Sequence, residues 1–350
     1  MSRYIQSITL LLCLLPLCAD AIKIPGLYQV EVPIADQSGE NRQLAIQTAL
    51  RLVLVKLTGD RYAPERTALA PVLEQAGDYV QQYRYKEAKR KDTDLPGQDI
   101  SGLTLWVRFD EETLNGALRG LSVPVWGKER PSTLIWLVVQ DASGRRLLSM
   151  DSESDYISVI DRRARQRGIV LIFPLLDLED TSRLRPSDIW GGFKGPVIAA
   201  SRRYQVDSIL TGSLEALAPG IWEGHWAAYI KEQTITWVTR GDLPDMALDE
   251  GVDGMSDILA AQFAHSGGLV QITDVNIAVA DIFNVDQYAR ALNYLESLNS
   301  VTDVQVKRVE PGKVTFSLSA HGGELAITQA IALGRVLQPI TAGNAYRLLP

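Results

Sequence analysis

The chain has 350 residues, with 35 Lys and Arg against 42 Asp and Glu, a net charge of −7, three His and two Cys. Both cysteines, Cys13 and Cys18, lie close to the N-terminus, so the rest of the chain has neither a disulfide framework nor a zinc–cysteine module. The acidic balance excludes a general nucleic-acid binder. A hydrophobic content of 46% with 22% charged residues is typical of a globular chain of two or three domains.

The first 21 residues have the pattern of a secretory signal peptide. A basic residue near the start is followed by an apolar run at 10–15 and by Ala-Asp-Ala at 19–21. We therefore predict export to the periplasm, with cleavage after Ala21. The alternative is a lipoprotein signal that uses Cys18, but Leu17 precedes this cysteine where a small residue is expected. The apolar run is too short for a membrane span.

Two segments divide the remaining chain into three units. Residues 122–132 contain two Pro and mixed charges, and residues 265–268 read His-Ser-Gly-Gly. The predicted fold class is α/β, more narrowly α+β, with three small domains that each combine a sheet and helices. Their predicted ranges are 22–123, 132–265 and 268–350.

The first unit is predicted to have the order βααββα. Residues 27–34 alternate apolar and polar side chains, as in a half-buried strand. Residues 41–57 form a broad apolar helical surface that ends before Gly59. The elements that follow are a helix after Pro64, strands near 79–86 and 103–109, and a short helix near 111–118.

The middle unit alternates strands and helices around an aromatic hairpin. Residues 133–139 are apolar almost without interruption, as in a strand buried on both faces. A long helix starts at Pro244, a residue that fits a first helical position. Between them we predict a partner strand after a turn at 141–144, a helix at 152–168, a strand at 169–173, a polar loop, a helix at 196–204, a strand at 208–214 and a hairpin over 222–238.

The last unit has the order βαββαβ, which is the ferredoxin-like arrangement. Both of its predicted helices carry their apolar residues on one side. The predicted elements are strands at 270–279, 301–309, 314–318 and 345–349, with helices at 284–298 and 323–337.

The sequence contains no established catalytic motif. It lacks G-x-S-x-G, S-x-x-K and H-E-x-x-H. Its three histidines, His225, His265 and His321, are scattered along the chain. A histidine without a neighbouring nucleophile is weak evidence for catalysis, and scattered histidines do not make a metal-ligand set. We therefore predict no catalytic residue, no metal site and no cofactor.

An acidic stripe follows the predicted helix that starts at Pro244. Asp245, Asp249, Asp253 and Asp257 recur every four residues, and each is rotated by about 40° from the last, so they share one slanting face. The interpretations that stay open are a solvated face, a docking surface for a basic partner, or a site for a loosely held cation. The edge of the C-terminal sheet is a second candidate docking surface, because edge strands carry unpaired backbone groups.

The hairpin of the middle unit carries a candidate glycan platform. Trp222 and Trp226 project to the same side of one predicted strand, with His225 between them. Exposed indoles stack on sugar rings, and His225 with nearby acids would suit a hydrolase. Large aromatic residues at alternate positions are also typical of a sheet face covered by a helix.

Two basic clusters interrupt the acidic sequence. Lys86, Lys89, Arg90 and Lys91 lie between two predicted strands and are a candidate contact for peptidoglycan or another anionic envelope polymer, although a solvated loop explains the same residues. Four arginines within 162–167 crowd the end of a predicted helix. Arginines there complement the helix dipole and need no ligand.

Four sequence segments carry a resemblance to a known family. They are residues 26–33 (GLYQVEVP), 56–59 (KLTG), 124–127 (PVWG) and 207–214 (DSILTGSL). On these segments the chain resembles a family of exported proteobacterial proteins that is catalogued only as a domain of unknown function. The resemblance spans most of residues 22–265 and implies no catalytic residue.

A second, local resemblance lies in the middle unit. Residues 204–214 with the motif LTGS, the hairpin up to Thr239 and the helix ending at 259–264 resemble periplasmic domains of outer-membrane lipoproteins. These are of the type that activates penicillin-binding proteins or builds curli-secretion rings. Such relatives bind partner proteins and are not enzymes, which is what the resemblance implies here, although this chain lacks their lipid-attachment signal.

The sequence therefore predicts a non-enzymatic periplasmic protein of the bacterial cell envelope, acting as a protein-interaction or assembly accessory factor. Its expected partners are envelope proteins, with no nucleic acid and no transmembrane span in the exported chain. The alternative is a cell-wall glycan-binding protein or hydrolase that uses Trp222, His225 and Trp226. The identity of the partner and the oligomeric state stay open.

Overall fold

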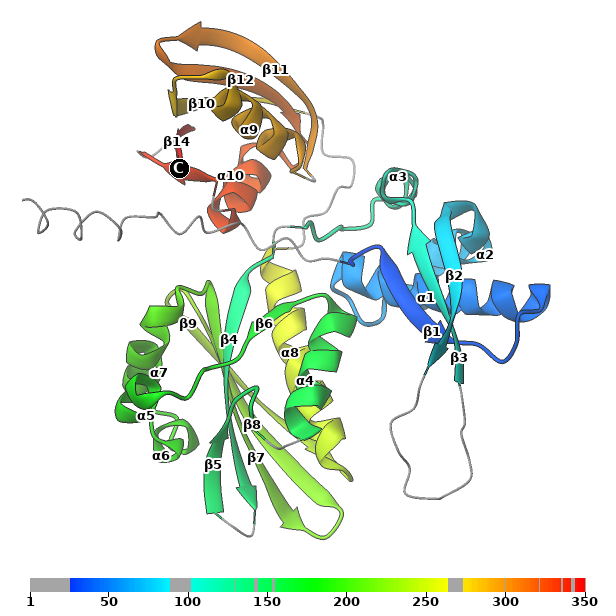
Figure 1. Ribbon diagram of the computed structural model, residues 1–350, viewed down its shortest axis with the longest axis vertical. Helices are drawn as coiled ribbons and strands as arrows, with labels where there is room; N and C mark the ends of the chain where they lie inside the picture. Colours follow the sequence, from blue (N-terminus) through cyan, green and yellow to red (C-terminus); the bar gives the residue numbers. More distant parts are fainter. Residues whose placement is uncertain are drawn as a thin grey trace, which may run out of the picture.

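The computed structural model describes residues 26–88, 102–128, 130–141, 144–152, 155–263, 273–298, 300–320, 322–334, 336–340 and 344–349. The predicted signal peptide with its cleavage site lies outside these residues, as do Cys13, Cys18, Lys89, Arg90, Lys91, His265 and His321. The described part forms three sheets, each with its own helices (Figure 1), which confirms the predicted α+β class of small sheet-plus-helix domains. No helix within the described ranges has the length and apolar character needed to span a bilayer.

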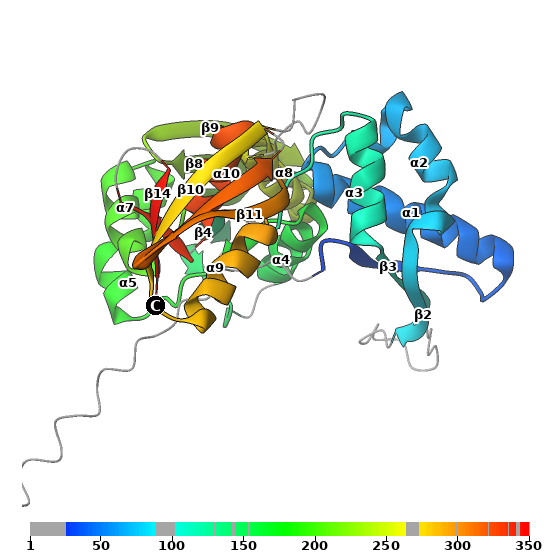
Figure 2. The same cartoon turned by 90° about the horizontal axis from the view of Figure 1, so that it is seen from above.

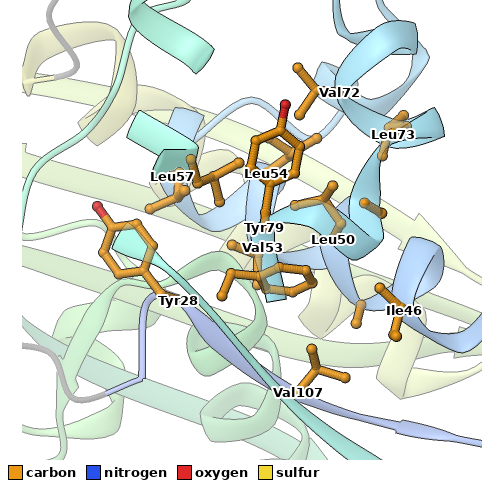
Figure 3. Close-up of a cluster of buried hydrophobic side chains, with 14 of the residues drawn as sticks. Tyr28, Ile46, Leu50, Val53, Leu54, Leu57, Val72, Leu73, Tyr79 and Val107 are labelled. Carbon is orange, nitrogen blue, oxygen red and sulfur yellow. The ribbon is translucent and has the colours of Figure 1, made fainter. Parts of the chain in front are cut away.

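The N-terminal domain packs a long helix against an antiparallel sheet of order β1-β3-β2. The helix α1 is capped by Ser38 and ends at Gly59, whose φ of 71° is left-handed. Its buried face meets α2 and the sheet in one apolar cluster (Figure 3). The elements are β1 (Gln29–Pro33), α1 (Gly39–Thr58), η1 (Ala63–Glu65), η2 (Thr67–Leu69), α2 (Ala70–Glu74), η3 (Ala76–Tyr79), β2 (Val80–Ala88), β3 (Gly102–Phe109) and α3 (Glu111–Gly120).

The middle domain is a sheet of order β5-β4-β7-β8-β9, with β6 also paired to β4. Figure 1 shows α4 and α8 on one face of this sheet and α5, α6 and α7 on the other. The parallel pair β4 and β7 lies at the centre, and β4 is buried because helices cover both of its faces.

The bounds of the middle-domain elements are β4 (Ser132–Asp141), β5 (Gly144–Leu148), α4 (Asp155–Arg167), β6 (Val170–Ile172), α5 (Leu178–Arg183), α6 (Pro186–Trp190), α7 (Lys194–Ser201), η4 (Arg202–Tyr204), β7 (Ser208–Ala218), β8 (Ile221–Ile230), β9 (Gln233–Gly241) and α8 (Pro244–Phe263). The predicted polar loop is wrong, because α5 and α6 lie there. Asp177 caps α5, and Pro186 occupies the first position of α6.

The C-terminal domain has a sheet of order β11-β12-β10-β14-β13. Its helices lie beside the sheet in the view from above (Figure 2). The elements are β10 (Thr273–Ile282), α9 (Val285–Glu296), β11 (Val301–Glu310), β12 (Gly312–Ala320), α10 (Gly323–Leu333), β13 (Leu337–Pro339) and β14 (Ala345–Leu348).

This topology has one strand more than the predicted βαββαβ order. A helical crossover from β12 returns a strand parallel to β12, and therefore antiparallel to β10. Here the returning strand is β13, which turns back into β14. The final strand β14 consequently lies beside β10 in parallel orientation. The short strand β13 was missed because only three residues form it.

Close packing of α8 on the middle sheet depends on small residues around Trp226. The indole is buried between β8 and α8, and a Cβ added at Gly251 of α8 would overlap it. A Cβ at Gly212 on the neighbouring strand β7 would approach the same ring to 2.5 Å. Glycine at these positions sets the distance between the helix and the sheet.

We expect Gly251→Ala to lower the free energy of unfolding by about 1–3 kcal/mol, because overpacking a close contact forces the neighbouring side chains to shift. Urea denaturation followed by tryptophan fluorescence measures this change. Gly195→Ala is the matched control, since this helical glycine of α7 has no atom within 4 Å of an added Cβ. Equal stability of Gly251→Ala and the unmodified chain would contradict the packing described here.

Candidate functional site

The acidic stripe predicted on α8 faces arginines of the same chain. Asp253 is only 3% exposed and accepts hydrogen bonds from Arg163 Nη2 at 2.6 Å and Arg167 Nη1 at 2.9 Å. Asp257 accepts from Arg167 Nη2 at 2.6 Å and from Arg61 Nη2 at 2.5 Å. At these two positions the predicted docking surface for a basic partner is wrong, because the basic groups are intramolecular.

The other two carboxylates of the stripe lie nearer to the start of α8. Asp249 Oδ1 lies 3.8 Å from Arg162 Nη2, and Asp245 lies in the first turn of α8, where the helix dipole favours a negative charge. Asp253 is therefore the buried carboxylate of the stripe, with its side chain 4% exposed, against 31% for Asp249 and 41% for Asp257. The arginines come largely from α4, which packs beside α8, and sequence periodicity alone does not show that two helices are neighbours.

Arg167 and Arg61 connect the N-terminal and middle domains. Arg167 is buried near the end of α4, and its Nη2 also donates to Gly59 O at 2.7 Å, at the C-terminal end of α1. Arg61, which follows α1, lies 3.4 Å from Asp253 Oδ2 in addition to its bond with Asp257. These charge-assisted bonds fix the end of α1 against α4 and α8.

A second buried arginine joins the same two helix ends. Arg130 donates to Lys56 O at 2.6 Å, to Gly168 O at 2.8 Å and to Trp126 O at 2.9 Å. Its guanidinium lies 4.1 Å from the centre of the Trp126 ring. The last carbonyls of a helix lack partners within the helix and carry partial negative charge, so a cation shared between two such ends stabilises both.

Burial lowers the pKa values of the cations at this junction. Desolvation lowers the pKa of Arg130 to about 9 and that of Lys56 to about 8, and the charge of Arg130 adds to the effect on Lys56. The Lys56 ammonium donates to Gly26 O at 3.3 Å and Gln29 O at 3.0 Å. Carbonyl dipoles, rather than carboxylates, are thus the acceptors for both cations in these bonds.

The pKa of Asp253 reflects two opposing effects. Burial raises it, but hydrogen bonds from Arg163 and the charges of Arg167, Arg163 and Arg61 outweigh burial, so the pKa lies below its ordinary value. The ion pairs therefore stabilise the fold above the ordinary pKa of 3.8. This stabilisation is lost as the pH falls through the lower pKa of the folded state.

We expect Asp253→Asn to lower the free energy of unfolding at neutral pH by about 3–5 kcal/mol, because buried Arg167 loses one of its two counter-charges and half-buried Arg163 loses its bidentate partner. Its stability should also fall less on acidification than that of the unmodified chain. Urea denaturation at a series of pH values measures both effects. Asp245→Asn on the same helix is the control, and similar losses in the two variants would show that burial of Asp253 is unimportant.

The predicted glycan platform on the hairpin is wrong for Trp226. This indole is buried beneath α8, stacks on Trp237 with 6.4 Å between ring centres, and donates to Thr239 Oγ1 at 3.0 Å. Trp222 is half-buried and meets the ring of Tyr156 edge-on. The aromatic residues form the covered face of the sheet, which is the other interpretation that the sequence left open.

His225 lies on the opposite face of β8 and is exposed. Its Nε2 lies 2.9 Å from Glu223 Oε1, and Arg240 Nε donates to Glu223 Oε2 at 2.5 Å. The bond from Arg240 holds the pKa of Glu223 below its ordinary value. Ser213 is the register partner of His225 on β7, but the structure gives no hydrogen bond between their side chains. Within the described residues, no group of three or more His, Cys, Asp or Glu side chains is arranged to hold a metal ion.

A cleft of about 610 Å³ lies between the N-terminal and C-terminal domains. Tyr28 and Asn115 line it and are hydrogen-bonded to each other, with Asn115 Nδ2 donating to Tyr28 Oη at 2.8 Å. Acidic and basic side chains both line the cleft, and Lys128 already pairs with Glu111 at 2.7 Å. This mixture does not favour a ligand of one charge.

One end of the C-terminal domain exposes a group of large apolar side chains, which we call the C-terminal patch. Phe283 is 75% exposed, Val285 78% and Val309 70%, and Val306 is also exposed. The patch joins the start of α9 to the end of β11. Soluble proteins seldom expose apolar side chains in a group without an interaction to explain it.

Strand register brings the patch together. Ile282 pairs with Gly312, and Val309 pairs with Val314, so the end of β10 and the end of β11 flank the start of β12. Phe283 follows β10, and its ring lies over Gly312, where an added Cβ would come within 2.8 Å of the ring. The residues of the patch therefore lie together at one end of the domain.

Sequence periodicity does not reveal these residues. Val285 has the helical spacing of the partly buried positions Tyr288 and Leu292. Val309 lies three residues after Val306, and a register shift between them pairs both with buried residues of β12, Val314 and Phe316. Periodicity gives the direction of a side chain but not the point where the opposing layer ends. The patch lies where α9 and β11 extend beyond the layer that they cover.

Comparison with known families gives a partial match. The family described as domain of unknown function DUF8605 matches residues 21–127, which include the N-terminal domain. The expected resemblance to a family of unknown function is confirmed over this part of the chain. No curated protein matches the chain.

Three solved structures are similar to parts of the chain. The LpoB C-terminal domain from Salmonella enterica is 14% identical and covers 32% of this chain and 80% of its own, with a TM-score of 0.23. An uncharacterized protein is 11% identical and covers 39% and 93%, with a TM-score of 0.19. The competence or damage-inducible protein from Enterobacter asburiae is 12% identical and covers 44% and 95%, with a TM-score of 0.23. Similarity at these scores carries no argument about function.

Proposed function

We propose that the chain is an exported, non-enzymatic protein of the bacterial cell envelope that binds another protein through the C-terminal patch. The observation that carries this proposal is the exposure of Phe283, Val285 and Val309 at one end of a small domain. An apolar centre of this kind, surrounded by polar groups, is the usual composition of a protein-binding surface.

The surroundings of the patch support a protein partner. Arg308 and Lys313 both lie within 4 Å of Glu310, at 3.8 and 3.7 Å, so charges of both signs border the apolar residues. Across the sheet, Arg347 pairs with Asp281 at 3.1 Å. A border of mixed charge favours a partner with its own mixed polar rim over a uniformly anionic polymer.

The rest of the molecule supports a role as a rigid base. The N-terminal and middle domains are joined by the buried bonds of Arg130 and Arg167, which hold both domains in one arrangement. The alternative function is glycan binding or hydrolysis at the hairpin. The His225–Glu223 pair and half-buried Trp222 are available for it, but Trp226 is buried in the core. The patch is therefore the better-supported site.

Site-specific photo-crosslinking in intact cells tests the proposal. A photo-reactive amino acid at Val285 should form a crosslink with a discrete envelope protein, which mass spectrometry identifies, because this position is central to the patch. The same amino acid at exposed Leu44 of α1 is the control. We expect the second substitution Val309→Lys to lower the Val285 crosslink about tenfold or more.

Three results would contradict the proposal. They are the absence of a protein crosslink at Val285, crosslinks of equal yield at Val285 and Leu44, and a Val285 crosslink that Val309→Lys leaves unchanged. Circular dichroism of Val309→Lys separates loss of binding from loss of folding.

A further inference from the structure

A pocket of about 310 Å³ lies where the N-terminal sheet meets the end of α4, and we call it the Lys56 pocket. Leu27, Val30, Trp106 and Ile169 form its apolar wall. Lys56 of α1 also lines the pocket and is only 9% exposed. An apolar wall with a few placed polar groups is the usual composition of a site for a small organic molecule.

The other charged side chains of the Lys56 pocket are already paired. Lys86 Nζ donates to Glu31 Oε2 at 2.7 Å. Arg165 Nη1 lies 2.5 Å from Asp161 Oδ2, one turn earlier in α4. Each of these pairs is neutral in sum. The charge that remains in the pocket is therefore that of Lys56.

The Lys56 ammonium has no negative partner among the described residues. Its Nζ donates to Gly26 O and Gln29 O, which both belong to residues of the pocket. An ammonium has three donors, so these bonds leave one donor without a partner in the described part of the chain. The charged neighbour that acts on Lys56 is Arg130, which has the same sign.

Carbonyl groups offset only part of the cost of burying these two cations. A cation that leaves water loses several kcal/mol of hydration, and a full negative charge compensates this loss better than a carbonyl dipole. The pKa values of Lys56, about 8, and of Arg130, about 9, lie below their ordinary values for this reason. An anion in the pocket would oppose both positive charges and accept from the third donor of Lys56.

We propose that the Lys56 pocket binds a small organic anion, whose carboxylate or phosphate group accepts a hydrogen bond from the Lys56 ammonium. The body of the ligand packs against the apolar wall formed by Leu27, Val30 and Trp106. The volume lies near the lower end of the range for small-molecule sites, which favours a ligand of roughly the size of one sugar acid or sugar phosphate. A cationic ligand is disfavoured, because Lys56 would repel it.

Calorimetric titration of the chain with three compounds that share one sugar ring tests the proposal. Methyl glucuronide carries a carboxylate, methyl glucoside 6-phosphate carries a phosphate, and methyl glucoside is neutral. At least one of the two anions should bind with a millimolar Kd, and the neutral compound should not bind. The stronger of the two anions identifies the acidic group that the pocket prefers. Failure of both anions to bind, or equal binding of the neutral compound, would overturn the proposal.

A substitution of the ammonium tests its role in the same titration. Lys56→Met should weaken binding of the anion about tenfold or more, because a charge-assisted hydrogen bond is lost. Urea denaturation checks that this variant remains folded. Lys194→Met is the matched control, since Lys194 is exposed on α7 and does not line the pocket. Equal affinities of the two variants would overturn the proposal.

Reductive methylation of the unmodified chain tests the site without a substitution. Formaldehyde with cyanoborohydride methylates accessible amines, and mass spectrometry of peptides gives the rate at each lysine. The anion that binds, at about ten times its Kd, should slow methylation of Lys56 about tenfold and leave Lys194 unchanged. Equal rates at Lys56 with and without the anion, or no reaction of Lys56 at all, would overturn the proposal. The pocket contains no residue of the C-terminal domain, so this proposal and that for the C-terminal patch can fail separately.

Discussion

Two buried arginines at the ends of α1 and α4 hold the N-terminal and middle domains together. Arg130 shares its donors between carbonyls at both helix ends, and Arg167 binds the end of α1 together with two carboxylates of α8. Burying a guanidinium costs several kcal/mol unless its donors are satisfied. Here most donors find carbonyls or carboxylates, and separating the domains would break the bonds to Lys56 O and Gly59 O.

This constraint explains the acidic stripe that stood out in the sequence. Asp253 and Asp257 are not a surface for a foreign partner, because they are the counter-charges of a junction within the chain. The regular spacing of four residues comes from the need to face one side of α8. A rigid two-domain base leaves the C-terminal patch as an exposed apolar surface of the described residues.

Much of the fold could be predicted from the sequence, because strand alternation and helical periodicity report directly on burial. The core face of α1, the buried strand β4 and the covered position of Trp226 are of this kind. The strand β13 and the helices α5 and α6 were missed because they are short. The C-terminal patch was missed because Val285 has core-like helical spacing and Val309 follows a register shift, and spacing shows neither where an opposing layer ends nor where the register shifts. The pairing of Arg167 with Asp253 depends on helix neighbours far apart in the chain.

Hydrogen exchange under native conditions tests the central claim most directly, by comparing α1 with α8 in increasing urea. If the arginine junction makes the two domains one cooperative unit, the slowest amides of both helices open with the same free energy and the same dependence on urea. Arg167→Met should then lower the opening free energy of α1 below that of α8. Different opening free energies in the unmodified chain, or an Arg167→Met variant in which both helices still open together with unchanged energy, would contradict the account.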